Sequence, residues 1–482
     1  MEAAALGVVT TINGYLSNYV LLFLLVGTGL FFTIRTRFVQ IRCFAEGWRR
    51  MFSGFSLRGG KQESGMSSFQ ALATAIAAQV GTGNIVGACG AILTGGPGAI
   101  LWMWIIAFLG MATNYAEAVL AQMTKKVDED GTVHGGPVYY IRTAFKGGLG
   151  KFLAAFFAVA IILSLGFMGC MVQSNSIAST CSTAFGIAPW IVGIIIALVA
   201  GFVFVGGVSR IASVTEKLVP LMAVIYLVGG LIVLCTRLDT IPATFALIFE
   251  SAFNPEAYFG GAVGGIIAAM TQGAKRGLFS NEAGMGSTPH AHAQANVKDP
   301  HEQGVVAFIG VFVDTFVVVT MTALVVISAV YIQDGAINTQ AYDFIAAAGL
   351  NKTNMAQYAF GTMFGSGFGN AFVAICLLFF AFSTILGWNL FSKINFVYLF
   401  GKKALPVFSV LAVFFVFLGS LLSNDLVWEM QDMFNQLMVL PNVIALIAMS
   451  GAVATCAKSH NGKKKALEPT EADAAVAAAE SE

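Results

Sequence analysis

The hydrophobic positions of this chain fall into eleven long runs that are separated by more polar connections. A helix needs about 20 predominantly apolar residues to cross the hydrocarbon core of a bilayer, and each run provides that length. The runs are Tyr15–Ile34, Ser67–Thr94, Pro97–Met123, Leu149–Thr180, Ile187–Gly206, Val214–Thr236, Gly260–Gly286, Gln303–Ile332, Phe368–Leu390, Ala404–Leu422 and Leu426–Ala457. The pattern predicts an all-α polytopic membrane protein with 11 transmembrane helices.

Two of these runs, Ser67–Thr94 and Gly260–Gly286, are interrupted in the middle by glycine and polar residues. The interruptions are Gln79-Val80-Gly81-Thr82-Gly83-Asn84 in the first run, and Thr271-Gln272-Gly273 followed by Ala274-Lys275-Arg276-Gly277 in the second. An unwound turn inside a bilayer leaves backbone N–H and C=O groups without partners, which costs several kcal/mol unless a ligand or cavity water binds them. Two interrupted helices at matching places in two halves of a chain therefore predict a transporter binding site near the membrane midplane.

The order of the runs also predicts a repeat. Setting the first run aside leaves two groups of five, and each group begins with an interrupted run. Because five is odd, the second group enters the membrane upside down relative to the first, as in two inverted five-helix repeats plus one N-terminal helix. We expect an N-terminal helix with a cytoplasmic interfacial helix at 1–66, the first repeat at 67–240, the second at 241–457 and a disordered cytoplasmic tail at 458–482.

Lysine and arginine collect in alternate connections. With the N-terminus outside, 24 of the 26 Lys and Arg residues fall on the cytoplasmic side, and only Arg237 and Lys352 fall outside. Positive residues favour the cytoplasmic side, so we expect an external N-terminus and a cytoplasmic C-terminus in the plasma (bacterial inner) membrane. Apolar residues from Phe38 to Phe52 recur at helical spacing with arginines between them, which predicts a helix on the inner leaflet.

Composition narrows the class of protein. The chain is 57% hydrophobic and 11% charged, about half the charge of a soluble domain. A net charge of +1 gives no reason to expect a nucleic-acid partner. A membrane enzyme would need a nucleophile–base pair or clustered metal ligands, and a channel would need rings of like charge or a repeated filter motif. The seven scattered cysteines and the loop histidines His290, His292 and His301 show no metal-ligand spacing, and we expect these histidines to be solvated.

The first interruption contains groups suited to both an anion and a cation. Free N–H groups at Gly81-Thr82-Gly83, with the start of a half-helix near Asn84, suit a carboxylate. Carbonyls released from Ala77, Gln79 and Val80 suit a sodium ion. Glycines in membrane helices also serve close packing, but packing alone does not require polar neighbours. A small amino acid with sodium is the expected ligand pair.

Several polar side chains lie elsewhere in the runs. Lys275, Arg276 and Glu282 follow the second interruption, and we expect them to form an ion-pair network at a gate on the cytoplasmic side. Asp314 is a candidate ion ligand or proton carrier. Ser383 and Thr384 offer two adjacent hydroxyls, which in a membrane helix more often bond to their own backbone.

Two long motifs carry a resemblance to a known family. They are Gly81-Thr82-Gly83-Asn84-Ile85-Val86-Gly87 with Gly95-Gly96-Pro97-Gly98-Ala99-Ile100-Leu101-Trp102-Met103-Trp104, and Lys275-Arg276-Gly277-Leu278-Phe279-Ser280-Asn281-Glu282-Ala283-Gly284-Met285-Gly286-Ser287 with Pro289-His290-Ala291-His292-Ala293. The chain resembles the sodium:alanine (alanine or glycine:cation) symporter family over essentially its whole length. The resemblance implies the leucine-transporter type of fold and inward movement of alanine or glycine with sodium, in some members with protons.

The resemblance also implies site residues. Sodium would be bound by Ala77, Val80, Phe380, Ser383 and Thr384, and a candidate second cation site would fall on Asn84, Thr271 and Asp314. Substrate contacts would come from Gln79, Gly81, Thr82, Gly83, Thr271, Gln272 and Gly273, with Phe167 and Trp388 as pocket walls.

The sequence therefore predicts a secondary active transporter, not an enzyme, that moves a small neutral amino acid with sodium by alternating access. Its partners are the amino acid, sodium or a proton, and membrane lipid, with no organic cofactor. The pattern does not decide whether alanine or glycine is the preferred substrate, which enantiomer is accepted, or whether sodium or a proton is the coupling ion. It also leaves open the ion stoichiometry and the oligomeric state. It also leaves open exchange or efflux, because gradients set the direction of transport.

Overall fold

The computed structural model describes residues 2–53, 65–129, 131–254, 265–333 and 335–460. Helices build the described chain, with two short hairpins between them. The elements of the first half are α1 (Glu2–Tyr15), α2 (Leu22–Arg35), α3 (Val39–Arg42), α4 (Phe44–Ser53), α5 (Ser68–Gln79), α6 (Ala88–Gly95), α7 (Ala99–Thr124), β1 (Lys126–Val127), β2 (Val133–His134), α8 (Pro137–Ala144), α9 (Gly147–Ile161), α10 (Cys170–Phe185), α11 (Pro189–Val205), α12 (Gly207–Cys235) and α13 (Ile241–Ser251). Those of the second half are α15 (Ile266–Asn281), α16 (Pro289–Ala293), α17 (Pro300–Phe312), α18 (Thr320–Val330), β3 (Ile332–Gln333), β4 (Ala336–Ile337), α19 (Ala341–Ala347), α20 (Met355–Phe364), α21 (Ser366–Phe400), α22 (Leu405–Gly419), α23 (Asn424–Ala448) and α24 (Ser450–Ser459).

Long apolar helices confirm a polytopic membrane protein. Among the described residues, six helices are long and apolar enough to cross a membrane, and two bent helix pairs raise the number to eight. The two pairs are α5 with Gly83–Gly95, bent by 46°, and α23 with α24, bent by 61°. Two other predicted spans correspond to the shorter apolar helices α2 and α11. The predicted span Gly260–Gly286 lies partly outside the described residues, as does the predicted tail beyond residue 460.

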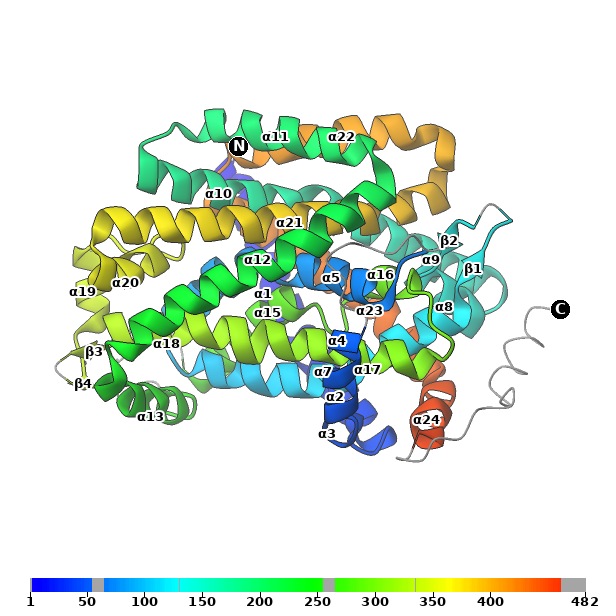
Figure 1. Ribbon diagram of the computed structural model, residues 1–482, viewed down its shortest axis with the longest axis horizontal. Helices are drawn as coiled ribbons and strands as arrows, with labels where there is room; N and C mark the ends of the chain where they lie inside the picture. The colour runs from blue at the N-terminus through cyan, green and yellow to red at the C-terminus, as the bar shows by residue number, and fades with distance from the viewer. Residues whose placement is uncertain (1, 54–64, 130, 255–264, 334, 461–482) are drawn as a thin grey trace.

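Most of the long helices, among them α7, α10 and α21, run along the long axis of the molecule, and many connections gather at its two ends (Figure 1). The hairpin β3–β4 lies with α13, α19 and α20 at one end, whereas β1–β2, α8 and α24 lie at the other. In the predicted orientation the first end is external and the second is cytoplasmic. Helix α5 lies in the middle of the bundle, where α12, α17 and α21 pack against it.

Local sequence signals explain where several helices begin. Ser67 accepts a hydrogen bond from the Gln70 N–H while the Gln70 side chain accepts one from the Ser67 N–H, a capping box that starts α5. Proline occupies the first turn of α8, α11 and α17, where its missing N–H costs no hydrogen bond. The predicted interfacial segment forms α3 and α4, and α4 packs against α17.

Candidate functional site

The first predicted break is present. Helix α5 ends at Gln79, Val80 adopts an extended conformation with ψ of 92°, and a π-helical turn begins at Gly83. Side chains bind two of the released N–H groups: the Asn84 Oδ1 accepts from the Gly81 N–H at 2.8 Å, and the Gln173 Oε1 accepts from the Thr82 N–H at 3.1 Å. The break is therefore hydrogen-bonded within the protein rather than exposed to lipid.

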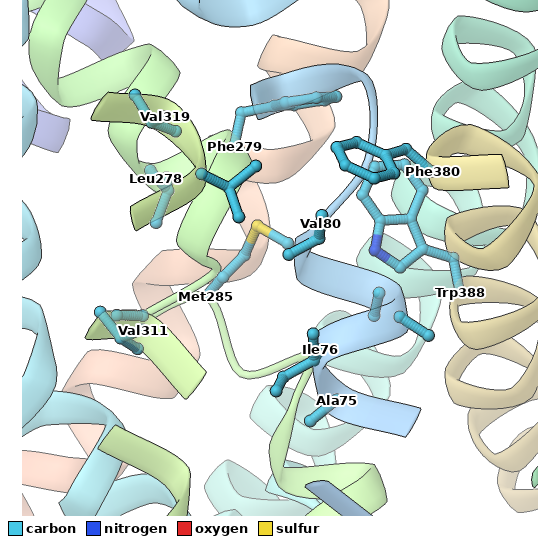
Figure 2. Close-up of a cluster of buried hydrophobic side chains, with 14 of the residues drawn as sticks. Ala75, Ile76, Val80, Leu278, Phe279, Met285, Val311, Val319, Phe380 and Trp388 are labelled. Atoms are coloured by element: carbon cyan, nitrogen blue, oxygen red, sulfur yellow. The ribbon is translucent and has the colours of Figure 1, made fainter. Parts of the chain in front are cut away.

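Five oxygen atoms converge beside this break. The Thr384 hydroxyl oxygen lies 3.0 Å from the carbonyl of Ala77, 3.1 Å from that of Phe380 and 3.4 Å from that of Val80. The Ser383 hydroxyl lies 2.8 Å from the Phe380 carbonyl and 3.4 Å from that of Ala77. The structure thus brings together all five residues that the family resemblance assigned to sodium, and Figure 2 shows Val80 and Phe380 side by side.

Gln173, on α10, is a site residue that the sequence analysis missed. Its Oε1 accepts hydrogen bonds from both the backbone N–H and the hydroxyl of Thr82, and its Nε2 is buried without a hydrogen-bond partner. A Cβ atom on Gly81 would lie 3.1 Å from the same Oε1, so glycine lets the amide approach the break. The polar sequence Gln173-Ser174-Asn175-Ser176 inside an apolar span was the signal that could have identified it.

The second break lies about ten residues later than predicted. Thr271, Gln272 and Gly273 are in the continuous helix α15, so the prediction that the helix breaks there is wrong. The chain leaves the helix at Glu282, which has φ of 59°, and Gly284 and Gly286 have φ of 86° and 81°. Alternating left-handed residues cannot continue a right-handed helix, and glycine adopts them without steric cost.

Close helix packing, rather than a break in the helix, explains the glycine at position 273. A Cβ atom on Gly273 would lie 2.5 Å from the Trp102 Cβ and 2.8 Å from the Ala99 carbonyl oxygen, both on α7. Gly273 therefore lets α15 and α7 approach closely, as small residues do between membrane helices. A single glycine lowers helix stability by about 1 kcal/mol relative to alanine, which does not break a packed helix.

Glu117, on α7, binds the backbone of the second break. Its carboxylate accepts from the N–H groups of Gly284 at 3.1 Å and Gly286 at 2.9 Å, and from the Asn442 side chain at 2.7 Å. Asn442 also donates to the Gly284 carbonyl at 2.9 Å. The unwound segment is held by polar side chains from two neighbouring helices.

A polar cluster around Asp314 joins the two broken helices. The Asp314 carboxylate accepts from the Asn84 amide at 2.6 Å, from the Ser280 hydroxyl at 2.9 Å and from the Thr315 hydroxyl at 2.9 Å. The structure thus brings Asn84 and Asp314 together but excludes Thr271 from this group. Thr271 precedes Ser280 by nine residues on α15, about 13 Å along the helix axis. Ser280 donates to Asp314 at the position in this cluster that was predicted for Thr271.

The predicted gate residues lie in two places. Arg276 pairs with both carboxylate oxygens of Asp432, at 2.8 and 3.2 Å, and Lys275 lies 3.1 Å from the same carboxylate. The Arg276 guanidinium also lies 4.6 Å from the ring centre of Trp428, and Lys352 lies 5.6 Å from it. This ion-pair network precedes the second break, so it lies toward α19 and α20, the external end in the predicted orientation. With that orientation, the break follows Lys275 and Arg276, so these two residues would lie on its external side rather than in the cytoplasmic half as predicted.

Glu282 lies at the break itself, apart from that network. Its carboxylate accepts hydrogen bonds from the indole N–H of Trp388 and the hydroxyl of Ser287. Trp388 is buried beside Phe279, with ring centres 5.7 Å apart, and the two approach the end of α5 from α21 and α15 (Figure 2). A polar contact thus fixes the orientation of the indole that the sequence placed in the pocket wall.

Phe167 does not join that wall. It stacks on Phe415 of α22, with ring centres 4.6 Å apart, and lies 6.1 Å from Phe408. Gly169 lies next to Trp388 instead, and a Cβ atom there would overlap the indole ring. The prediction for Phe167 is wrong because neighbouring residues of one helix face different sides.

The loop histidines are buried rather than solvated, which corrects a further prediction. His290 and His292 are at most 1% exposed and hydrogen-bond to Asn395 and Gln303 respectively, at 2.7 and 2.8 Å. Burial lowers the pKa of His290 to about 4 and that of His292 to about 3, so both rings are neutral at pH 7. These side chains therefore act as neutral hydrogen-bonding groups of the core.

Comparisons with known proteins agree with this architecture. The family model of the sodium:alanine symporter family matches residues 2–474. The sodium/alanine symporter AgcS of Methanococcus maripaludis is 40% identical over 458 residues, which cover 95% of this chain and 97% of the relative. The probable sodium/glutamine symporter GlnT of Bacillus subtilis is 37% identical and covers 94% of this chain and 90% of the relative.

A solved structure supports the fold. The crystal structure of MhsT in complex with L-phenylalanine is similar with a TM-score of 0.57 at 14% identity, covering 87% of this chain and 99% of the other. This likeness confirms the leucine-transporter type of fold. The family and its characterised relatives are transporters rather than enzymes, and sodium is the coupling ion in the family's name. This multi-pass membrane protein therefore belongs to the sodium:alanine symporter family.

Proposed function

We propose that this protein imports a small neutral amino acid, alanine or glycine, together with sodium by alternating access. The observation that carries the proposal is the convergence of five oxygen atoms, from Ala77, Val80, Phe380, Ser383 and Thr384, on the unwound end of α5. Sodium ions bind hard oxygen ligands, and released carbonyls at a helix break are a characteristic source of them. A sodium ion there would join α21 to the first break.

The substrate carboxylate is assigned to the N–H groups of the same break, at Gly81, Thr82 and Gly83. Gln173 holds the Thr82 N–H in this structure, so the amino acid would replace an amide oxygen by a carboxylate oxygen. Charge-assisted hydrogen bonds to N–H groups are stronger than neutral ones, which favours that exchange. Gln79 lies at the same break, and its Oε1 is buried without a hydrogen-bond partner.

Bulky rings limit the size of the side chain that fits. Trp388 and Phe279 contact each other beside the break, and no acidic or basic residue occupies positions 79–84. A pocket of this kind selects small neutral side chains, although one methyl group changes binding by only about 1–3 kcal/mol. The relative named as a probable glutamine symporter makes glutamine the substrate to compare.

Asp314 is assigned to a second cation or to a proton. Its three donors, Asn84, Ser280 and Thr315, come from both broken helices and from its own helix. Hydroxyl groups can rotate to present oxygen lone pairs to a cation. Binding of a cation or a proton at Asp314 would therefore depend on whether the two broken helices are in contact.

The transport cycle follows from the proposed topology of eleven spans, with two inverted repeats and an external N-terminus. The ion pair of Lys275 and Arg276 with Asp432 lies on the external side of the site and closes it there. Placing these two cations outside leaves 22 of the 26 Lys and Arg residues on the cytoplasmic side, so the charge bias that sets the orientation persists. Release of the ion pair would open the external path.

Reconstituted vesicles test the proposal directly. Uptake of labelled alanine, glycine and glutamine is measured with an imposed sodium gradient, an imposed proton gradient, or neither. We expect saturable alanine and glycine uptake that needs sodium, with little glutamine uptake. Binding of alanine that is independent of sodium in purified protein would contradict the coupling, since linkage requires each ligand to raise the affinity of the other.

A further inference from the structure

A cluster of metal-ligating side chains lies where α4 meets α17, away from the broken helices. Cys43, Glu46 and His301 place a sulfur, a carboxylate oxygen and an imidazole nitrogen within 4.8 Å of one another. The His301 side chain is fully buried and Cys43 is 4% exposed, whereas 29% of the Glu46 side chain is exposed. The cluster is therefore enclosed by protein and has one open side.

Close helix packing creates this cluster. Gly47 lies against α17, where a Cβ atom would come 2.5 Å from the Val305 carbonyl oxygen and 2.8 Å from the Ile309 side chain. Glycine lets α4 approach α17 at this point, and the residues that precede it are carried to the start of α17. Three residues from two distant parts of the sequence thus meet, so their spacing along the chain gave no metal-binding motif.

The hydrogen bonds of His301 leave one ring nitrogen unused. The His301 Nδ1 lies 2.8 Å from the Tyr115 hydroxyl, and that hydroxyl donates to the Cys456 sulfur at 3.8 Å. In the tautomer that carries its proton on Nδ1, which donates to this hydroxyl, Nε2 keeps its lone pair. This Nε2 is buried, has no hydrogen-bond partner and lies 3.6 Å from the Glu46 carboxylate.

An acceptor nitrogen that faces a carboxylate requires a cation between them or a proton on the nitrogen. Arg50 binds the other carboxylate oxygen at 2.9 Å, which leaves Oε2 directed at His301. Cys43 adds a third ligand that a simple ion pair would not use.

We propose that Cys43, Glu46 and His301 bind a divalent transition-metal ion, with zinc the best match to these ligands. Zinc binds thiolate, imidazole and carboxylate at about 2.3, 2.0 and 2.1 Å, in tetrahedral geometry. Two ligands at about 2.1 Å from one ion are about 3.4 Å apart at that geometry, close to the 3.6 Å between Nε2 and Oε2. Tyr115 fixes the ring through its other nitrogen, as outer partners of metal-binding histidines do.

A neighbouring group is less suitable for an ion. His301, Cys456 and His460 also lie within 4.8 Å of one another. Both nitrogens of His460 have partners, the Cys456 carbonyl at 2.9 Å and the Asp299 carboxylate at 2.7 Å. Cys456 therefore provides a control on the opposite side of the same imidazole.

The bound ion would fasten α4 to the start of α17. Helix α17 continues into the π-helical segment Val313–Val319, which carries Asp314. A metal at Glu46 and His301 would hold the end of that helix in place. The site is a structural clamp next to the transport machinery rather than part of it.

Cobalt titration of the purified full-length protein in detergent tests the site. We expect one equivalent of Co²⁺ to produce a thiolate-to-cobalt charge-transfer band, which Zn²⁺ then removes. Cys43→Ser should abolish the band, and Glu46→Gln, which preserves the side-chain shape, should lower affinity at least tenfold. Cys456→Ser should retain the band, and size-exclusion profiles verify that each variant is folded.

Two results would overturn the assignment. Wild-type protein without the band would mean that a proton on His301 neutralises the pair. Loss of the band in Cys456→Ser but not in Cys43→Ser would place the ion on the other side of the imidazole.

Discussion

The hydroxyl of Thr384 donates a 3.0 Å hydrogen bond to the carbonyl of Ala77, although the two residues are 307 positions apart in the sequence. The contact fastens α21 to the end of α5, where the backbone leaves its helical path. In the proposed mechanism the same two oxygen atoms bind sodium. Binding of the ion and joining of these helices would then be a single event.

Removing this hydroxyl should weaken sodium binding. Thr384→Ala deletes one of five ligand oxygens, worth about 1.5 kcal/mol, so we expect apparent sodium affinity to fall about tenfold. Thr384→Ser keeps the oxygen and should remain within about threefold of wild type. Alanine uptake at varied sodium concentration measures both, and equal sodium dependence in Thr384→Ala and wild type would remove Thr384 from the site.

A fixed negative charge at Gln173 should compete with the substrate. Gln173→Glu places a carboxylate next to the Thr82 N–H, so we expect apparent alanine affinity to fall at least tenfold, about 1.4 kcal/mol. Ser176→Ala, one turn along the same helix, removes a hydroxyl that has no hydrogen-bond partner and should leave affinity unchanged. Binding is measured by scintillation proximity at saturating sodium, and unaltered affinity in Gln173→Glu would place the substrate carboxylate elsewhere.

Ser280 and Thr271 form a matched pair for the second cation site. Ser280→Ala removes a hydroxyl that donates to Asp314, so the ion dependence of alanine uptake should weaken several-fold. Thr271→Val removes a hydroxyl nine residues earlier that has no hydrogen-bond partner, and ion dependence should stay within about twofold. Uptake is recorded over a range of sodium concentration and pH. A larger effect of Thr271→Val than of Ser280→Ala would contradict the placement.

The buried ion pair should contribute more to stability than the exposed one. Asp432→Asn leaves Lys275 and Arg276 without a counter-charge, which costs about 3–5 kcal/mol when a buried pair loses one partner. Asp425→Asn removes the partner of Lys352, but Asp425 is 74% exposed, so about 0–1 kcal/mol is expected. Thermal unfolding in detergent measures both variants. Equal melting temperatures of the two variants would contradict this larger contribution of the buried pair to stability.

Patterns within single helices were predictable from the sequence. The break at Gln79–Asn84 combines glycine with hydrogen-bonding side chains, and both properties are visible in the sequence. The pairing of Thr384 with Ala77 came from resemblance to a family, because helical spacing alone gave those hydroxyls no partner. Local backbone chemistry and family motifs therefore identified most of the first break.

Contacts between helices were not predictable in the same way. Gly273 and Gly284 are both glycines in a polar context, but Gly273 packs on α7 whereas Gly284 adopts a left-handed conformation. Only the neighbouring helix distinguishes the two roles. The prediction for Phe167 and the omission of Gln173 have the same cause. The rotation of a helix in the bundle decides which of its side chains face the break, and the sequence does not show that rotation.

One hydrogen bond has a mechanical consequence. The Gln79 amide donates to the carbonyl of Asn281 at 2.7 Å, so the last residue of α5 is tied to the last residue of α15. Because this hydrogen bond joins their ends, we expect α5 and α15 to move together. A hydrogen bond contributes about 1 kcal/mol, so breaking this one would shift the ratio of joined to separated tips about fivefold. Gln79 therefore adds to the cost of separating the two broken helices, next to the proposed ligand site.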